Sequence, residues 1–220
     1  MKVLLSIFVC MSSSMLIGCA AMKYEVPQVE LLPTLKVTGG KSQSLLLNKL
    51  MINIPRGETI GKASGGVFCI NPRDIIWKAG IVSLSDQNFK EVFDSELKNN
   101  GYEVMGSSNS LFEEKTIAKP DYLVAGEITS ISETFCYPNS GFGNFDYVRG
   151  GVFIKIRWEV YSTRTNSVEL SISTSGSSGK EQETQLGPNE FMLQAFRMAV
   201  QNLLAQEKFH GLVSTEKIRS

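Results

Sequence analysis

Apolar and charged side chains alternate between residues 152 and 160, and this is the clearest pattern in the chain. Lys155, Arg157 and Glu159 separate the apolar residues, which are Val152, Ile154, Ile156, Trp158 and Val160. Such alternation predicts a strand with one buried and one wet face. A turn at 163–166 and a second alternating run at 168–173 extend the prediction to a hairpin over 151–174.

Helical spacing occurs twice. Apolar residues between Phe89 and Leu97 recur every three or four positions and the run ends at Asn100-Gly101, which predicts a helix over 86–99 with Ser85 as its N-cap. A second run after Asn189, its expected N-cap, predicts a helix over 190–206. Its apolar stripe should lie on the sheet and consists of Met192, Ala195, Phe196, Ala199, Val200 and Leu203.

Shorter apolar runs predict further strands. We place them at residues 51–54, 65–70, 102–105 and 121–135. Gly126 is expected to form a bulge in the last of these. The Gly- and Ser-rich stretch 176–180 is expected to be a flexible turn.

Leu16-Ile17-Gly18-Cys19 follows a short apolar run and resembles a bacterial lipobox. The run is too short and too rich in serine to span a bilayer, and with Lys2 before it the pattern is typical of an export signal. The resemblance implies cleavage between Gly18 and Cys19 and lipid, including palmitate, on the Cys19 sulfur. The alternative is an ordinary cleaved signal peptide with an incidental cysteine.

The residue after Cys19 is alanine rather than aspartate. In a Gram-negative host, the lipobox resemblance then implies transfer to the outer membrane, with the protein lipid-anchored and facing the periplasm.

Together these elements predict an α+β fold of the α/β sandwich type. We expect a mixed, mainly antiparallel sheet with two main helices packed on it, preceded by an extended N-terminal tether in which prolines and glycines recur. The predicted divisions are a lipoprotein signal peptide at 1–18, a lipidated tether at 19–45, a single α/β domain at 46–210 and a flexible tail at 211–220.

The charge balance bears on the kind of partner. The chain carries 22 basic and 22 acidic residues, so its formal net charge is +0. Nucleic acid or an anionic lipid surface as the main partner would favour a basic excess, so neither is expected.

Four cysteines are present, of which Cys10 leaves with the signal and Cys19 carries the lipid. The remaining pair, Cys69 and Cys136, is expected to form a disulfide in an oxidising periplasm. The alternative is two separately buried thiols.

The sequence lacks the residue patterns typical of catalytic and metal-binding sites. The only histidine is His210, at the end of a helical stretch, and the sequence has no C-x-x-C pair. We therefore predict that the protein is not an enzyme and takes no cofactor or metal.

Aromatic residues interleave with glycine and proline between residues 135 and 147. Exposed aromatic side chains on such a loop suit contact with a partner, and the candidates are Tyr137, Phe142, Phe145 and Tyr147. The alternative is a loop that folds its own aromatic side chains onto the domain beside Cys136.

Three stretches, 81–105, 121–131 and 152–174, follow an element order that resembles the curli secretion channel lipoprotein. YajG-type lipoproteins, the lipoprotein activator of penicillin-binding proteins and the N-terminal domain of the Tol-system β-propeller protein have related folds. In a channel subunit, two membrane hairpins would emerge at 137–150 and 175–188. Each segment has only 14 residues, too few for two membrane strands of about 9 to 11 residues each.

The sequence therefore favours a non-enzymatic, lipid-anchored periplasmic protein that binds another envelope protein, as an assembly factor or as a component of an envelope or secretion complex. Two alternatives stay open: a ring- or pore-forming subunit, which would be a homo-oligomer, and an envelope hydrolase or peptidoglycan-modifying enzyme.

Overall fold

A long β-hairpin forms the centre of the structure, a computed structural model that describes residues 26–38, 42–78, 86–105 and 119–215. Strand β5 (Val148–Ser162) pairs antiparallel with β6 (Ser167–Thr184). The alternation prediction is confirmed, because Lys155 and Arg157 are exposed whereas the predicted apolar set is fully buried, namely Val152, Ile154, Ile156, Trp158 and Val160. The predicted hairpin is confirmed and continues beyond residue 174.

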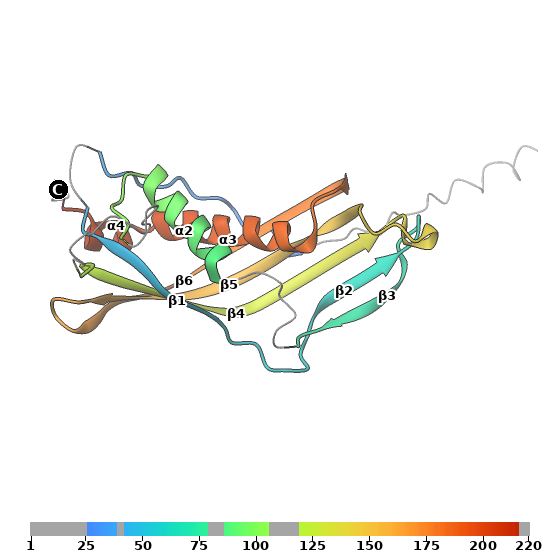
Figure 1. Cartoon of the computed structure of the whole chain (residues 1–220), viewed down its shortest axis with the longest axis horizontal. Helices are drawn as coiled ribbons and strands as arrows, with labels where there is room; N and C mark the ends of the chain where they lie inside the picture. The colour runs from blue at the N-terminus through green and yellow to red at the C-terminus, as the bar shows by residue number, and fades with distance from the viewer. Residues whose placement is uncertain (1–25, 39–41, 79–85, 106–118, 216–220) are drawn as a thin grey trace, which may run out of the picture.

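Strand β4 (Tyr122–Tyr137) lies antiparallel along the other edge of β5. The free edge of β4 then holds two parallel strands in succession. Strand β1 (Leu45–Ile52) pairs with its first half and β2 (Thr59–Gly65) with its second half. Strand β3 (Ile70–Ile76) pairs antiparallel with β2 and completes a mixed six-stranded sheet (Figure 1).

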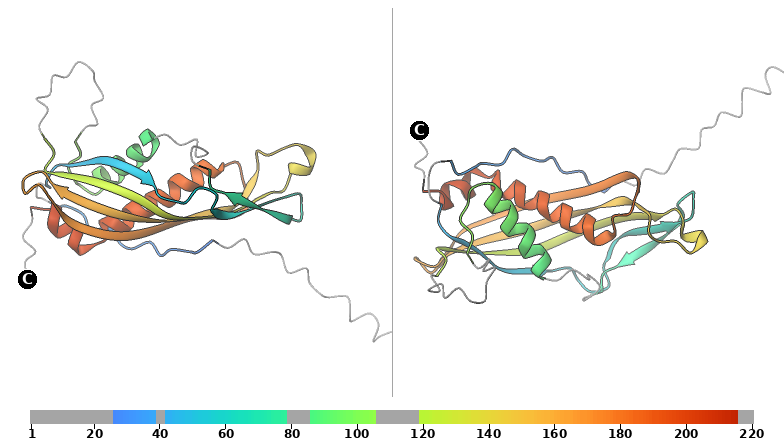
Figure 2. Two further views of the ribbon diagram at one scale, coloured as in Figure 1. Left: turned by 90° about the horizontal axis from the view of Figure 1, so that it is seen from below. Right: turned by 45° about the horizontal axis from the view of Figure 1, so that its top comes forward.

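The helices lie together on one face of this sheet (Figures 1 and 2). Helix α3 (Pro188–Leu204) packs on β5 and β6, and α2 (Asp86–Asn99) packs on α3 and β1. The short α4 (Glu207–Val213) follows α3. Among the described elements no helix covers the opposite face of β4, β5 and β6. The α+β prediction with a mixed, mainly antiparallel sheet is confirmed.

Trp158 joins the helices to the sheet. Its ring lies 6.0 Å from the ring centroids of Phe93 in α2 and Phe196 in α3. Its Nε1–H donates a hydrogen bond of 2.8 Å to Thr174 Oγ1, and the Thr174 hydroxyl donates one of 2.8 Å to the carbonyl oxygen of Ala199. Polar atoms at the centre of the core are thus bonded, which avoids the cost of burying them alone.

The backbone of helix α3 lies directly against β6 at Gly176. A Cβ atom placed there would lie 2.0 Å from the carbonyl oxygen of Ala195 and 2.6 Å from the amide nitrogen of Ala199. The predicted flexible turn at 176–180 is therefore wrong: these residues belong to β6. The small size of Gly176 serves the contact with the helix backbone rather than a change of chain direction.

Two of the predicted short strands are also wrong. Residues 66–69 form the turn between β2 and β3, where Cys69 has φ 51°, and Pro72 lies within β3. Strand β3 is at the edge of the sheet, so the missing amide hydrogen of Pro72 removes no hydrogen bond from a central strand. Residues 102–105 make only an isolated bridge between Val104 and Leu45.

Two local predictions need correction. Gly126 stays in register with Leu50 and Trp158, and the bulge lies at Thr129, between Ile128 and Ser130. A Cβ at Gly126 would lie 2.8 Å from Trp158 Cζ3, so the glycine makes room for that ring. Helix α3 is capped by Gly187 rather than by Asn189, because Pro188 occupies the first helical turn.

The N-terminal segment, residues 26–38, lies bound along the side of the domain. The amide of Val29 donates to Ser177 Oγ, that of Leu32 to Asn202 Oδ1 and that of Leu35 to the carbonyl oxygen of Leu204. This part of the predicted tether therefore belongs to the folded body (Figure 1). At the other end, the predicted boundary at residue 210 falls inside α4, whose Val213 is fully buried.

We predict that Gly176→Ala lowers the free energy of unfolding by about 3 kcal/mol, because the helix backbone must move away from β6. Urea denaturation followed by circular dichroism measures the change. Gly141→Ala is the matched control, since its Cβ would meet nothing within 4 Å. Equal stability of the two variants would show that α3 does not depend on this close approach.

Candidate functional site

One end of the sheet brings together two turns that are far apart in the sequence. Pairing of Gly65 with Tyr137 places the β2–β3 turn beside the β4–β5 loop, residues 138–147. The amide of Gly66 then donates hydrogen bonds of 3.0 Å to the carbonyl oxygen of Tyr137 and to Ser140 Oγ. The loop itself contains a short 3₁₀ helix, η1 (Ser140–Phe142).

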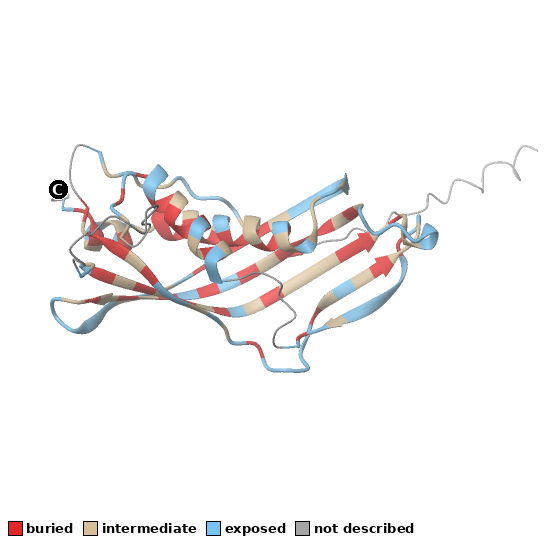
Figure 3. Ribbon diagram, viewed as in Figure 1, coloured by how far each residue is buried: buried red, intermediate tan, exposed pale blue. Residues whose placement is uncertain are grey.

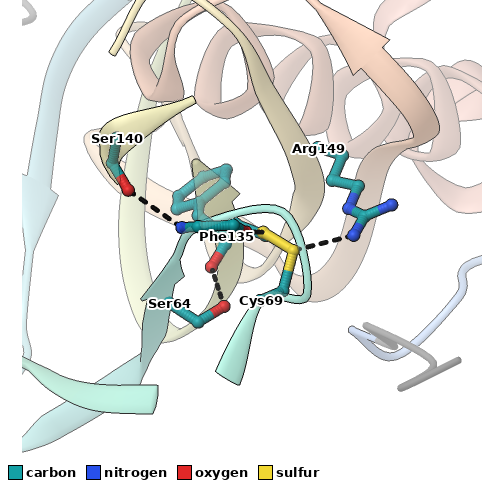
Figure 4. Close-up of a disulfide and its surroundings, with 7 residues drawn as sticks. Ser64, Cys69, Phe135, Ser140 and Arg149 are labelled. Carbon is teal, nitrogen blue, oxygen red and sulfur yellow. Dashed lines mark hydrogen bonds between the residues drawn. A yellow bond between two sulfur atoms is a disulfide. The ribbon is translucent and has the colours of Figure 1, made fainter. Parts of the chain in front are cut away.

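A disulfide between Cys69 and Cys136 fastens the two turns together, as predicted (Figure 4). The two Cα atoms are 5.6 Å apart and both residues are fully buried. The guanidinium of Arg149 donates from Nη2 to Cys69 Sγ at 2.8 Å. Because this link closes a long stretch of chain, the relative position of the two turns is fixed in the folded protein.

Apolar side chains project from both turns into solvent. Phe142 is 83% exposed and Phe145 63%, and in the β2–β3 turn Phe68 is 80% exposed. We call this group the tip surface; it consists of Val67, Phe68, Ile70, Phe142 and Phe145. Figure 3 shows exposed residues at this end of the molecule. The alternative in which the loop buries its own aromatic side chains is wrong for Phe142 and Phe145.

The other aromatic residues of the predicted contact are partly covered. Tyr137 is half-buried and lies 6.0 Å, centroid to centroid, from the ring of Phe145. Tyr147 is also half-buried, and its hydroxyl accepts a hydrogen bond of 3.1 Å from Gln185 Nε2. Phe135 is buried against Phe191 of α3. Only part of the predicted set is therefore available to a partner.

The sequence prediction missed three residues at the β2–β3 turn, two within it and one at the start of β3. Val67, Phe68 and Ile70 fall within the predicted strand 65–70, close to Cys69. The expected bond from Cys69 to Cys136 was the signal that could have placed them beside the aromatic loop.

The uncovered side of the sheet forms a second surface, which we call the open face. It is defined by the alternate residues of β5 that point away from the helices, namely Phe153, Lys155, Arg157, Glu159 and Tyr161. Arg157 forms an ion pair with Glu127, whose Oε1 also accepts a hydrogen bond of 2.7 Å from Asn53 Nδ2. The guanidinium is therefore held in place in the free protein.

His210 has a structural contact. Its Nδ1 lies 2.7 Å from the hydroxyl of Tyr102, and burial raises the pKa of that hydroxyl to about 12. In the part of the chain that the structure describes, no group of three or more His, Cys, Asp or Glu residues could hold a metal ion. The predicted processing and lipidation residues, Gly18 and Cys19, lie outside the described residues.

Glu133 is the most perturbed carboxyl group of the sheet. It lies in β4 opposite Val152 and Gly61, and burial raises its pKa from 4.5 to about 7. Burial and the charge of Glu133 together raise the pKa of Tyr137. The carboxyl group near the base of the aromatic loop therefore favours its protonated form.

Comparison with known proteins leaves the family of the chain open. No protein-family model matches the sequence, and no curated protein matches it. Among solved structures, the chain is similar to protein XCC0632 of family DUF330 from Xanthomonas campestris, with 10% identity, a TM-score of 0.38, and coverage of 84% of this chain and 92% of that one.

Two further structures come from bacteria. PelC from Paraburkholderia phytofirmans, described as a dodecamer, has 10% identity and a TM-score of 0.35 over 83% of this chain and 99% of its own. Lipoprotein GNA1162 from Neisseria meningitidis has 11% identity and a TM-score of 0.28 over 71% and 97%. These scores are too low to transfer a function. Within the described residues, no helix is long and apolar enough to cross a membrane.

We predict that replacing both cysteines, Cys69→Ala with Cys136→Ala, lowers the free energy of unfolding by about 4 kcal/mol, because the unfolded chain regains the entropy of the closed loop. Urea denaturation with and without reductant measures it. Reductant should destabilise the parent protein by a similar amount and leave the double variant unchanged. A parent protein insensitive to reductant would contradict the prediction.

Glu133 predicts a pH dependence of stability. Between pH 4.5 and about 7 the folded chain holds a proton that the unfolded chain has lost, so the free energy of unfolding falls as pH rises through this window. Glu133→Gln should remove this component and stabilise the protein by about 2 kcal/mol at pH 8. Urea denaturation at pH 5 and pH 8 tests it, with the exposed Glu183→Gln as control. Parallel pH profiles for all three proteins would contradict the assignment.

Proposed function

We propose that the chain is a non-enzymatic, lipid-anchored protein of the bacterial envelope that binds another envelope protein, as an assembly factor or a component of a larger complex. The lipobox-like sequence around Cys19 supports the anchor and the outer-membrane location. The N-terminal segment, residues 26–38, is bound along the side of the folded domain. The role of His210 in contacting Tyr102 supports packing rather than catalysis.

The open face is the observation that carries this proposal. It presents Phe153, Arg157 and Tyr161 on one strand, and Met51 of β1, which is 43% exposed, lies opposite Glu127 on the same face. Arginine, methionine and aromatic residues are enriched in protein interfaces. The ion pair with Glu127 orders Arg157 before binding, which lowers the entropy cost of a contact.

The open face also has the dimensions of a protein interface. The three long strands behind it have 15 to 18 residues each, so they extend about 50 to 60 Å. A protein partner could therefore bury several side chains at once along the strands, whereas a small ligand would need a concave site.

Photo-crosslinking in cells tests the proposal. With benzoylphenylalanine at Lys155 or at Ser173, both exposed on the open face, we expect the same protein adduct from both positions. Gln87, exposed on α2 on the helical side, is the matched control and should yield at least several-fold less. An absence of specific adducts from both open-face positions would reject the proposal.

A further inference from the structure

The tip surface is poorly explained by the fold of the domain alone. Its five apolar side chains, Val67, Phe68, Ile70, Phe142 and Phe145, are each more than half exposed. Four of them lie in the turn and the loop and Ile70 is the first residue of β3, and polar residues at such exposed positions would cost little in stability. The disulfide and the hydrogen bonds of Gly66 hold the two turns together, so the surface is present before any contact is made. Exposed apolar side chains gathered at one end of a domain in this way mark an interaction site.

The N-terminal segment shows which end of the domain faces the anchor. Val26 is buried, and a Cβ placed on Gly151 would lie 3.1 Å from its Cγ2 atom. Gly151 is three residues from the start of β5 at the tip. From there the segment runs away from the tip, since Val37 donates to the carbonyl oxygen of Asn100 at the end of α2. The described chain therefore begins near the tip surface.

The length of chain between Val26 and Cys19 then limits the position of the lipid. Seven residues span at most about 25 Å, whatever their conformation. The start of β5 lies about 10 Å along the strand from Gly151, whereas its far end lies about 36 Å away. Along the strand direction, the tip end of the domain is therefore within reach of a membrane that holds Cys19, whereas the far end is not.

We propose that the tip surface inserts into the lipid headgroup region of the same membrane leaflet that holds the Cys19 lipid, which rests on the lipid anchor of the proposed function. The occupant is a lipid surface rather than a protein. A lipid and a short chain already hold the tip at the bilayer, so a few apolar side chains suffice for a second contact.

Burial of apolar surface, rather than charge, drives this contact. The charged residues near the tip are of both signs, with Asp146 and Glu181 acidic and Arg149 and Lys180 basic. They provide no net attraction to anionic headgroups. The domain consequently stands with the tip in the membrane interface and the 163–166 turn away from it, which leaves the open face accessible to a protein from the side.

The test uses the full lipidated chain, purified from membranes and reconstituted into vesicles of phosphatidylcholine and phosphatidylethanolamine that contain brominated phosphatidylcholine. Phe142→Trp reports on the tip. Val168→Trp is the matched control, because Val168 is also apolar and 51% exposed but lies at the opposite end of the sheet. Trp77 and Trp158 are buried and are common to all proteins, so the parent protein supplies the background.

We expect emission of the Phe142→Trp protein to shift to shorter wavelength on reconstitution and to be quenched at least threefold more strongly than that of Val168→Trp. Equal quenching of both variants would overturn the proposal. Vesicle flotation is measured first: a chain that does not float lacks the anchor and refutes the lipid part of the proposed function, whereas a chain that floats without selective quenching refutes only tip insertion. A protein adduct from benzoylphenylalanine at Phe142 in cells, without quenching, would assign the tip to a protein partner instead.

Discussion

The sharing of one edge of β4 between two parallel strands is the constraint on which the rest of the structure depends. β1 fills the first half of that edge and β2 the second. Because β2 runs parallel to β4, its end must lie beside the end of β4, and the turn that follows it must meet the β4–β5 loop. The disulfide and the position of the exposed residues beside it follow from this arrangement.

The parts of the fold that sequence patterns predicted are those whose periodicity is local. The alternation of β5 and the stripe of α3 each arise within one element that has one buried face, so the pattern records the burial directly. The second half of β6 was missed for the opposite reason. Small residues such as Gly176 carry no such pattern, and their position is set by the backbone of α3, a helix that begins later in the chain.

The same distinction applies to the candidate site. The disulfide between Cys69 and Cys136 was predicted from the expected oxidising compartment and from the number of cysteines that remain after Cys10 and Cys19. Both are inferred from the sequence alone. The exposure of each aromatic side chain could not be predicted from the sequence in this way. Phe135 and Phe142 lie in the same aromatic segment, yet Phe135 is buried under α3 and Phe142 projects into water. What separates them is the end of the helix above the sheet, a tertiary relation that periodicity does not contain.

The bound N-terminal segment also determines how the domain would bear a mechanical load. A pull on an N-terminal attachment would act first on Val26 and then on the hydrogen bond between Val29 and Ser177. These contacts lie in sequence along the side of the sheet, between the attachment point and the strands. The segment would therefore lengthen under tension before the sheet itself is strained, acting as a built-in extension between the attachment point and the core.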